Sequence, residues 1–223
     1  MGKFIELTAA DGHKFAAFVA EPAGKPRGGV VVIPEIFGVN SHIQQVTDGF
    51  AADGYLAVAP AMFDRVQRNY DTGYSQPEIQ AGVAIMQQLK HDQSILDVEA
   101  AVCEAAKGGK VGIVGYCFGG TIAWLAASRA KGLACSVPYY GGGMHGLIGE
   151  KPKVPVMCNF GETDHSPTLA QAKEIAAAHP GITAHYYANA GHGFNCDQRG
   201  SWNADAAKLA RSRTIEFFRK HIG

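Results

Sequence analysis

Short apolar runs alternate along the whole chain with stretches in which apolar residues recur at the spacing of a helix. Two runs that are rich in β-branched residues and free of charge, 29–33 and 111–114, predict strands buried on both faces of a parallel sheet. Two earlier runs, 3–8 and 14–20, alternate polar and apolar residues around the turn Ala10-Asp11-Gly12, so they predict a hairpin. Shorter strand-like runs follow at 55–59, 134–139, 154–160 and 182–187.

Apolar residues with helical spacing separate these strands. Residues 41–52 place Ile43, Val46 and Phe50 on one face, and Gly54 follows as a C-cap. The other predicted helices are 77–90, 93–107, 121–127, 169–178 and 202–221, whereas the mixed, aromatic stretch 61–76 is interpreted as a loop near the site. This alternation predicts an α/β fold with a mainly parallel central sheet and helices on both faces. No repeat or linker interrupts it, so we expect residues 1–223 to form a single domain.

Composition and charge limit the kinds of molecule that the protein is expected to bind and the compartment in which it is expected to work. Lys plus Arg and Asp plus Glu balance at 20 each, so nothing favours nucleic acid or an anionic membrane surface. No apolar run is long enough to span a bilayer, and the N-terminus lacks a signal-peptide pattern. The five cysteines are widely spaced and form no C-x-x-C pair, which argues against a disulfide framework and a zinc site and for a reducing compartment. We therefore expect a cytoplasmic protein, and a monomer.

The stretch 111–124, VGIVGYCFGGTIAW, has the layout of a nucleophile elbow with Cys117 in the place of the more usual serine. Strand, Gly-x-Cys-x-Gly and helix follow one another, and side chains at Gly115 and Gly119 would collide with the neighbouring elements in so tight a turn. The positive end of the following helix favours thiolate over thiol, and the backbone N–H of Phe118 can face the oxyanion that forms when a carbonyl is attacked. A buried cysteine that merely packs in a glycine-rich turn is the alternative interpretation.

Two later loops supply candidate partners for the thiol, each directly after a predicted strand. Asp164 lies in GETDH at 161–165, and His192 lies in AGHGF at 190–194. Because the carboxyl ends of parallel strands share one edge of a sheet, these side chains can converge on Cys117 in the order nucleophile, acid, histidine. Asp164 could instead cap a helix and His192 could be an ordinary loop residue, but three matches in order favour a triad. His165 is a second candidate for the base, but it is next to Asp164 in the sequence, and adjacent residues rarely face one another. No histidine has the spacing of metal ligands, so no metal and no cofactor are predicted.

Four motifs together resemble the dienelactone hydrolase (carboxymethylenebutenolidase) family: GYCFGG at 115–120, PEIFGVN at 34–40, GETDH at 161–165 and AGHGF at 190–194. They run in order over nearly the whole chain. The resemblance implies an α/β-hydrolase fold and cofactor-free hydrolysis of a lactone or enol ester. It places the nucleophile on Cys117, the acid on Asp164 and the base on His192.

The same resemblance implies roles for four further residues. Glu35 follows an apolar strand, and the matching glutamate of the family contacts the resting thiol and helps to remove its proton when substrate binds. The N–H groups of Ile36 and Phe118 fall where the family has its oxyanion hole. Tyr139 matches a tyrosine of the substrate pocket.

This chain departs from the family where a substrate carboxylate would bind. Family members that act on dienelactone use two arginines, and the matching positions here hold Ile79 or Gln80 and Cys196. Arg199 or Arg68 could substitute as the pocket cation. Without one, we expect an uncharged lactone or ester to be the better substrate.

The sequence therefore predicts a cysteine-dependent hydrolase of carboxylic esters, with a small-molecule lactone or enol ester as substrate. A broader esterase or thioesterase acting on an uncharged acyl group is the alternative among enzymes. A non-catalytic protein that uses the Cys117 thiol for redox sensing or ligand binding is the alternative from another class. The sequence does not name the physiological substrate or the pathway.

Overall fold

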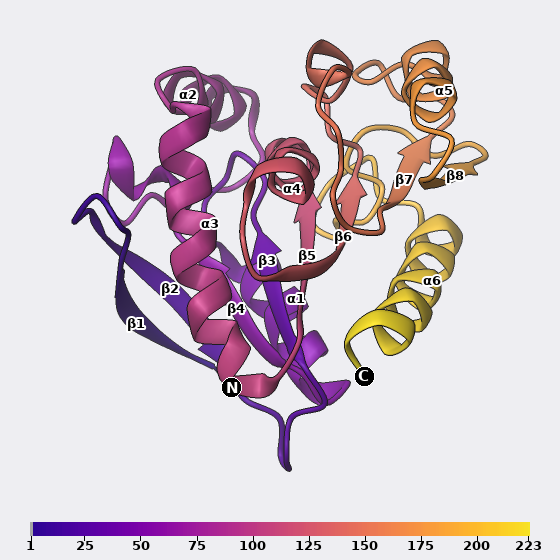
Figure 1. Cartoon of the computed structure of the whole chain (residues 1–223). Coiled ribbons are helices and arrows are strands. Elements are labelled where there is room, and N and C mark those ends of the chain that lie inside the picture. The colour runs from indigo at the N-terminus through magenta and orange to yellow at the C-terminus, as the bar shows by residue number, and fades with distance from the viewer. Residues whose placement is uncertain (1) are drawn as a thin grey trace.

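The computed structural model describes residues 2–223 and places eight strands in one sheet, in the order β1-β2-β4-β3-β5-β6-β7-β8 (Figure 1). β1 pairs antiparallel with β2, and β2 antiparallel with β4, whereas every pairing from β4 to β8 is parallel. The fold is thus the mainly parallel α/β arrangement that the alternating pattern predicts. The strands are β1 (Lys3–Thr8), β2 (Lys14–Ala20), β3 (Gly29–Ile33), β4 (Leu56–Pro60), β5 (Val111–Tyr116), β6 (Leu133–Tyr139), β7 (Met157–Gly161) and β8 (Thr183–Tyr187).

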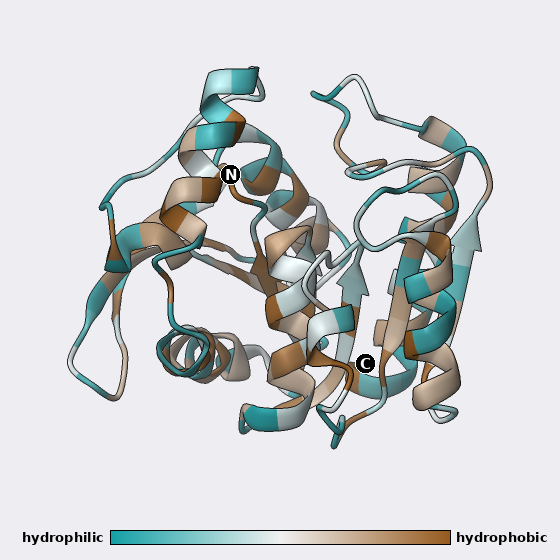
Figure 2. Ribbon diagram, turned by 90° about the horizontal axis from the view of Figure 1, so that it is seen from above, coloured by the Kyte–Doolittle hydropathy of each residue, from teal (hydrophilic) through white to brown (hydrophobic). Residues whose placement is uncertain are grey.

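Helices cover both faces of the sheet. α1 and α6 pack on one face, where alternate strand residues such as Val30 and Val32 join their cluster. α3 and α4 pack on the other face, which receives Val31 and Ile33, and α5 extends that layer over β7. Figure 2 shows hydrophobic segments inside the molecule and hydrophilic ones on outer turns. The helices are α1 (Ser41–Ala52), α2 (Gln76–Met86), α3 (His91–Ala105), α4 (Phe118–Arg129), α5 (Leu169–Ala178) and α6 (Ala204–Ile222), with short 3₁₀ turns η1 (Met62–Arg65), η2 (Ala106–Gly108) and η3 (His145–Leu147).

The two strands at the centre of the sheet are apolar on both sides for a physical reason. β3 and β5 pair in parallel with Val31 opposite Ile113, and all their residues are buried between the two helix layers. A parallel strand covered on both faces has no solvent side, so its sequence loses the polar alternation seen in β1. The carboxyl ends of β3 and β5 consequently lie side by side, and the loops that leave them form one wall of the site.

The structure confirms most of the predicted elements but shortens two of them. The run 154–160 forms a strand only from Met157, with a single bridge at Val156; Pro155 has no N–H to give to a sheet ladder. The helix expected to reach residue 90 ends at Met86, while the stretch 61–76 is irregular apart from η1. Among residues 2–223, no helix is long and apolar enough to cross a membrane.

Candidate active site

The turn between β5 and α4 holds Cys117 in a backbone conformation that is rare for a side-chain-bearing residue. Its φ is 56° and its ψ is −114°, so the thiol stands away from the sheet at the start of the helix. The turn closes because two glycines allow contact: a Cβ on Gly115 would collide with the carbonyl of Gly119, and one on Gly119 with the carbonyl of Ile33. The elbow geometry predicted from the glycine spacing is present.

Cys117, His192 and Asp164 form a continuous chain of hydrogen-bonding contacts. Sγ of Cys117 lies 3.0 Å from Nε2 of His192, and Nδ1 of His192 lies 3.0 and 3.2 Å from the two carboxylate oxygens of Asp164. Asp164 follows β7 and His192 follows β8, so the edge formed by the carboxyl ends of the strands brings together residues that are far apart in the sequence.

The surroundings of His192 hold its ring in place and change its protonation. Asp164 is buried and also accepts a hydrogen bond from the N–H of Ser166 at 2.8 Å, which fixes the carboxylate, and the ring of Tyr140 packs edge-on against the imidazole with centroids 5.3 Å apart. Burial alone lowers the pKa of His192, but the charge of Cys117 and the hydrogen bond to Asp164 outweigh it and raise the pKa to about 10. The environment thus favours a protonated imidazole beside the sulfur.

Ile36 and Phe118, the two residues expected to supply oxyanion N–H groups, line the same cavity as Cys117. Phe118 is the first residue of α4, and the first N–H groups of a helix have no carbonyl one turn earlier to bond to. Ile36 belongs to the turn that follows β3. Donors placed at this position suit an oxygen that becomes negative when sulfur attacks a carbonyl.

The thiol opens into a cavity of about 730 Å³ whose outer wall is apolar. That wall comes from α2 and the residues after it: Ile79, Val83, Met86 and Leu89. His165, His192 and Arg199 also line the cavity, and no carboxylate from residues 2–223 does so. His165 is exposed, and its ring nitrogen lies 3.8 Å from Asp164, so His192 and not His165 faces the sulfur.

Glu35 differs from its expected position beside the resting thiol. One of its oxygens, Oε1, accepts a hydrogen bond from Arg199 at 2.9 Å, and the other has no hydrogen-bond partner among residues 2–223. Burial lowers the pKa of Arg199, but the charge of Glu35 outweighs it, so the net shift is upward. Instead of a hydrogen bond to sulfur, Glu35 forms an ion pair with Arg199, whose guanidinium lies against Gly193.

The structure corrects two further expectations about the substrate pocket. Tyr139 is fully buried behind the site, where its hydroxyl lies 2.6 Å from Thr214 Oγ1, and it does not line the cavity. Its neighbour Tyr140 faces His192 instead. Cys196 is also fully buried, so that position is no part of the cavity wall.

The two arginines considered as pocket cations lie in different places in the structure. Arg199 does line the cavity, as one of the two arginines considered for a substrate carboxylate. Arg68 is exposed on the surface, 3.7 Å from Glu6. Sequence reasoning missed the wall provided by α2, although the apolar spacing of Ile79, Val83 and Met86 was available as a signal.

Comparisons with known proteins agree on one family. The model of the "Dienelactone hydrolase family" matches residues 15–222. A carboxymethylenebutenolidase of Pseudomonas putida is 35% identical, with 96% of this chain and 94% of the relative covered, and one from another Pseudomonas species is 31% identical, with 97% and 94% covered. Among solved structures, a dienelactone hydrolase-like promiscuous phosphotriesterase from metagenomic libraries superposes with a TM-score of 0.79 at 21% identity, with 100% of this chain and 99% of that one covered, and shares the fold.

Proposed function

Since the chain belongs to the dienelactone hydrolase family and is a carboxylic ester hydrolase of the carboxymethylenebutenolidase type, we propose that it opens lactones or enol esters through the thiol of Cys117. The observation that carries this proposal is the contact of 3.0 Å between Cys117 Sγ and His192 Nε2, with Asp164 on the other ring nitrogen. A nucleophile, a base and an orienting group in that arrangement are what covalent acyl transfer requires.

In the first half-reaction, Cys117 Sγ bonds to the carbonyl carbon and the carbonyl electron pair moves onto oxygen. The N–H groups of Ile36 and Phe118 stabilise this oxyanion. When the carbonyl re-forms, the C–O bond of the ester breaks, and the leaving oxygen takes the proton from His192 Nε2. The product of this half-reaction is a thioester on Cys117 and, from a lactone, a free enol or alcohol at the other end of the same molecule.

In the second half-reaction, the neutral imidazole of His192 accepts a proton from water while the water oxygen attacks the thioester carbon. Collapse of this second oxyanion expels the thiolate, and the carboxylic acid product loses its proton to solvent. Asp164 keeps the ring in the orientation that both transfers need, and it stabilises the imidazolium formed in the second. The site returns to thiolate and imidazolium, the state favoured by the raised pKa of His192.

Glu35 and Arg199 have a supporting role in this scheme. Arg199 lies on the cavity wall, and its charge is balanced by Glu35 at 2.9 Å rather than by solvent. A substrate anion would have to draw Arg199 away from a buried carboxylate, which has a desolvation cost of several kcal/mol. This neutralised cation, with the apolar wall of α2, favours an uncharged lactone or ester over an anionic one.

The test is turnover of a small activated aryl ester combined with intact-mass analysis. We expect Cys117→Ala to reduce kcat by on the order of a thousandfold or more, since the nucleophile is lost. Cys103→Ala and Cys158→Ala, which alter an exposed cysteine and one buried in β7, are matched controls and should retain activity. His192→Ala should accumulate an acyl adduct on Cys117, because deacylation has lost its base.

Two results would contradict the proposal. Unchanged turnover in Cys117→Ala would remove the thiol from the mechanism. A complete lack of turnover in the unmodified protein, with Cys117 still reactive toward peroxide, would favour the redox-thiol alternative.

A further inference from the structure

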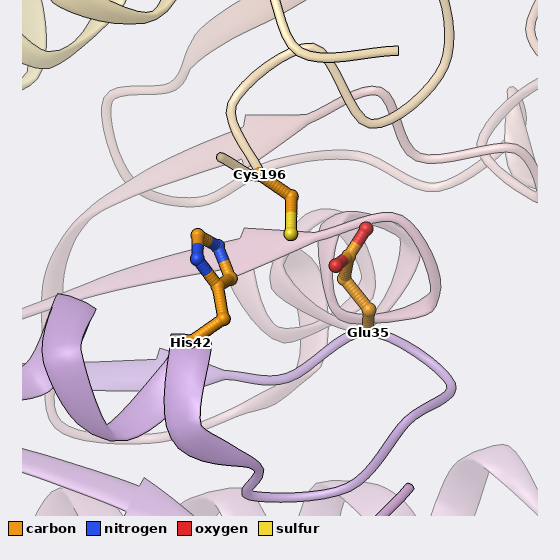
Figure 3. Close-up of side chains that lie close together, drawn as sticks. All are labelled: Glu35, His42 and Cys196. Atoms are coloured by element: carbon orange, nitrogen blue, oxygen red, sulfur yellow. The ribbon is translucent and has the colours of Figure 1, made fainter. Parts of the chain in front are cut away.

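A second cluster of chemically reactive side chains lies next to the Cys117 site but takes no part in the triad. Glu35 after β3, His42 in the first turn of α1 and Cys196 in the loop after β8 are all buried, and one ligand atom of each lies within 4.8 Å of the other two. Figure 3 shows the Cys196 sulfur between the His42 ring and the Glu35 carboxylate. Glu35 and His42 lie close together between β3 and the first turn of α1, but Cys196 is far away in the sequence, which is why no spacing motif reveals the set.

Two buried polar atoms of this cluster have no hydrogen-bond partner among residues 2–223. They are Nε2 of His42 and Oε2 of Glu35, on side chains that are 5% and 2% exposed. Buried polar groups are nearly always satisfied, because an unpaired one costs about 1–3 kcal/mol. Two such atoms in one cluster, beside a thiol, indicate a site built for a ligand that accepts electron pairs from both.

The outer contacts of the cluster match those around metal ligands. Nδ1 of His42 lies 3.2 Å from the carboxylate of Asp197, which fixes the ring and leaves Nε2 free as a donor. Arg199 occupies only one oxygen of Glu35 and leaves Oε2 free. A carboxylate on the far nitrogen of a histidine is the common outer-shell partner of a metal-bound imidazole.

We propose that His42 Nε2, Cys196 Sγ and a Glu35 carboxylate oxygen bind one zinc ion. Nitrogen, sulfur and oxygen ligands in a set of three, with a fourth position left for water, are typical of Zn²⁺. In an occupied tetrahedral site such atoms lie about 3.3–3.6 Å apart, so the three side chains have to approach one another by up to about 1.5 Å. The ion enters from a surface groove that His42 and Asp197 line on the α1 side, away from the cavity of Cys117.

The binding step balances with the loss of one proton. Zinc takes the sulfur as thiolate, and one proton leaves to solvent for each ion bound. The negative charges of the Cys196 thiolate and the Glu35 carboxylate then lie against the two positive charges of the ion, and Asp197 stays on the far nitrogen of His42.

The first experiment is calorimetric titration of Zn²⁺ into the Cys117→Ser protein, which removes the catalytic thiol as a competing ligand. We expect one ion per chain, about one proton released, and a thermal midpoint that rises with zinc concentration. Co²⁺ in the same protein should produce visible thiolate-to-cobalt absorption. The added substitutions Cys196→Ser and His42→Gln should each weaken binding at least a hundredfold, and Cys158→Ser, a buried cysteine elsewhere, should leave it unchanged.

The Cys196 and His42 variants alter buried residues and could fail to fold, so Asp197→Asn is tested as well. The Asp197 side chain is 53% exposed, and its substitution should leave the protein folded. It should weaken zinc binding about 10- to 100-fold, as loss of a histidine's outer carboxylate does, while the circular dichroism spectrum stays the same. The proposal is overturned if the Cys117→Ser protein binds no zinc. It is also overturned if those of the Cys196→Ser, His42→Gln and Asp197→Asn variants that fold bind zinc as tightly as the Cys117→Ser protein does.

Discussion

Introducing a cation at Ile79 should change which substrate the enzyme prefers. Ile79 lies in α2, is half-buried and faces the cavity, where Arg199 is the one lysine or arginine on the wall within residues 2–223. Because Arg199 is already bonded to Glu35, a carboxylate on the substrate meets no free positive charge. Ile79→Arg supplies a second guanidinium on a cavity wall that no carboxylate from residues 2–223 lines.

The size of the effect follows from one charged hydrogen bond, which contributes about 1.5–3 kcal/mol. Since each 1.4 kcal/mol corresponds to about a factor of ten, kcat/KM for an anionic lactone should rise about ten- to a hundredfold relative to a neutral analogue. The loss of a half-buried isoleucine costs about 1 kcal/mol of folding stability, which leaves the protein folded at 25 °C.

The assay compares kcat/KM for dienelactone and for its primary amide, which has the same shape without the charge. The unmodified protein should prefer the amide, and Ile79→Arg should move the ratio toward the acid. Ile79→Gln is the matched control, because it adds polarity and length without charge and should leave the ratio unchanged. If the unmodified protein already prefers the acid, Arg199 is an available carboxylate ligand and the reasoning from its ion pair is wrong.

Two further predictions test the triad and the elbow. Cys117→Ala removes the largest influence that raises the pKa of His192, so the imidazole of the variant should lose its proton at a lower pH than that of the unmodified protein. NMR titration of the imidazole measures both midpoints, and equal midpoints would contradict the prediction. Gly119→Ala places a Cβ against the carbonyl of Ile33, so it should lower the free energy of unfolding by about 1–3 kcal/mol and also lower kcat. Gly24→Ala, which has open space around it, should change neither quantity. Denaturant titration and activity assays measure both, and an unchanged Gly119→Ala protein would refute the close packing of the turn.

Features that depend on neighbouring residues could be predicted from the sequence. The range of α5, Leu169–Ala178, matches the expected 169–178, because its start is set by a local capping box in which Thr168 and Gln171 bond to each other's backbone. The elbow at Cys117 was predictable for the same reason, since strand, glycines and helix are consecutive. Local chemistry therefore defined both the helix and the position of the nucleophile.

Features that depend on tertiary contacts could not be predicted. Glu35 and Arg199 are 164 residues apart, and nothing in the sequence indicates that they pair. The pocket role of Tyr139 was implied by the family resemblance alone, and a motif match does not show what its side chain contacts. The Tyr139 hydroxyl is buried against Thr214, whereas Tyr140, whose φ is 36°, packs against the ring of His192.

The order of strands in the sheet affects how the protein folds. β3 and β5 are neighbours at its centre, yet residues 34–110 separate them along the chain, and Asp164 and His192 follow β7 and β8. Such distant pairings close large loops, which slows folding. During synthesis a ribosome-bound chain exposes the apolar edges of β3 and β5 before β8 and α6 exist to complete the layers. Assembly of the candidate active site is therefore a late, whole-molecule event, and a chain truncated before residue 192 contains Cys117 but lacks His192.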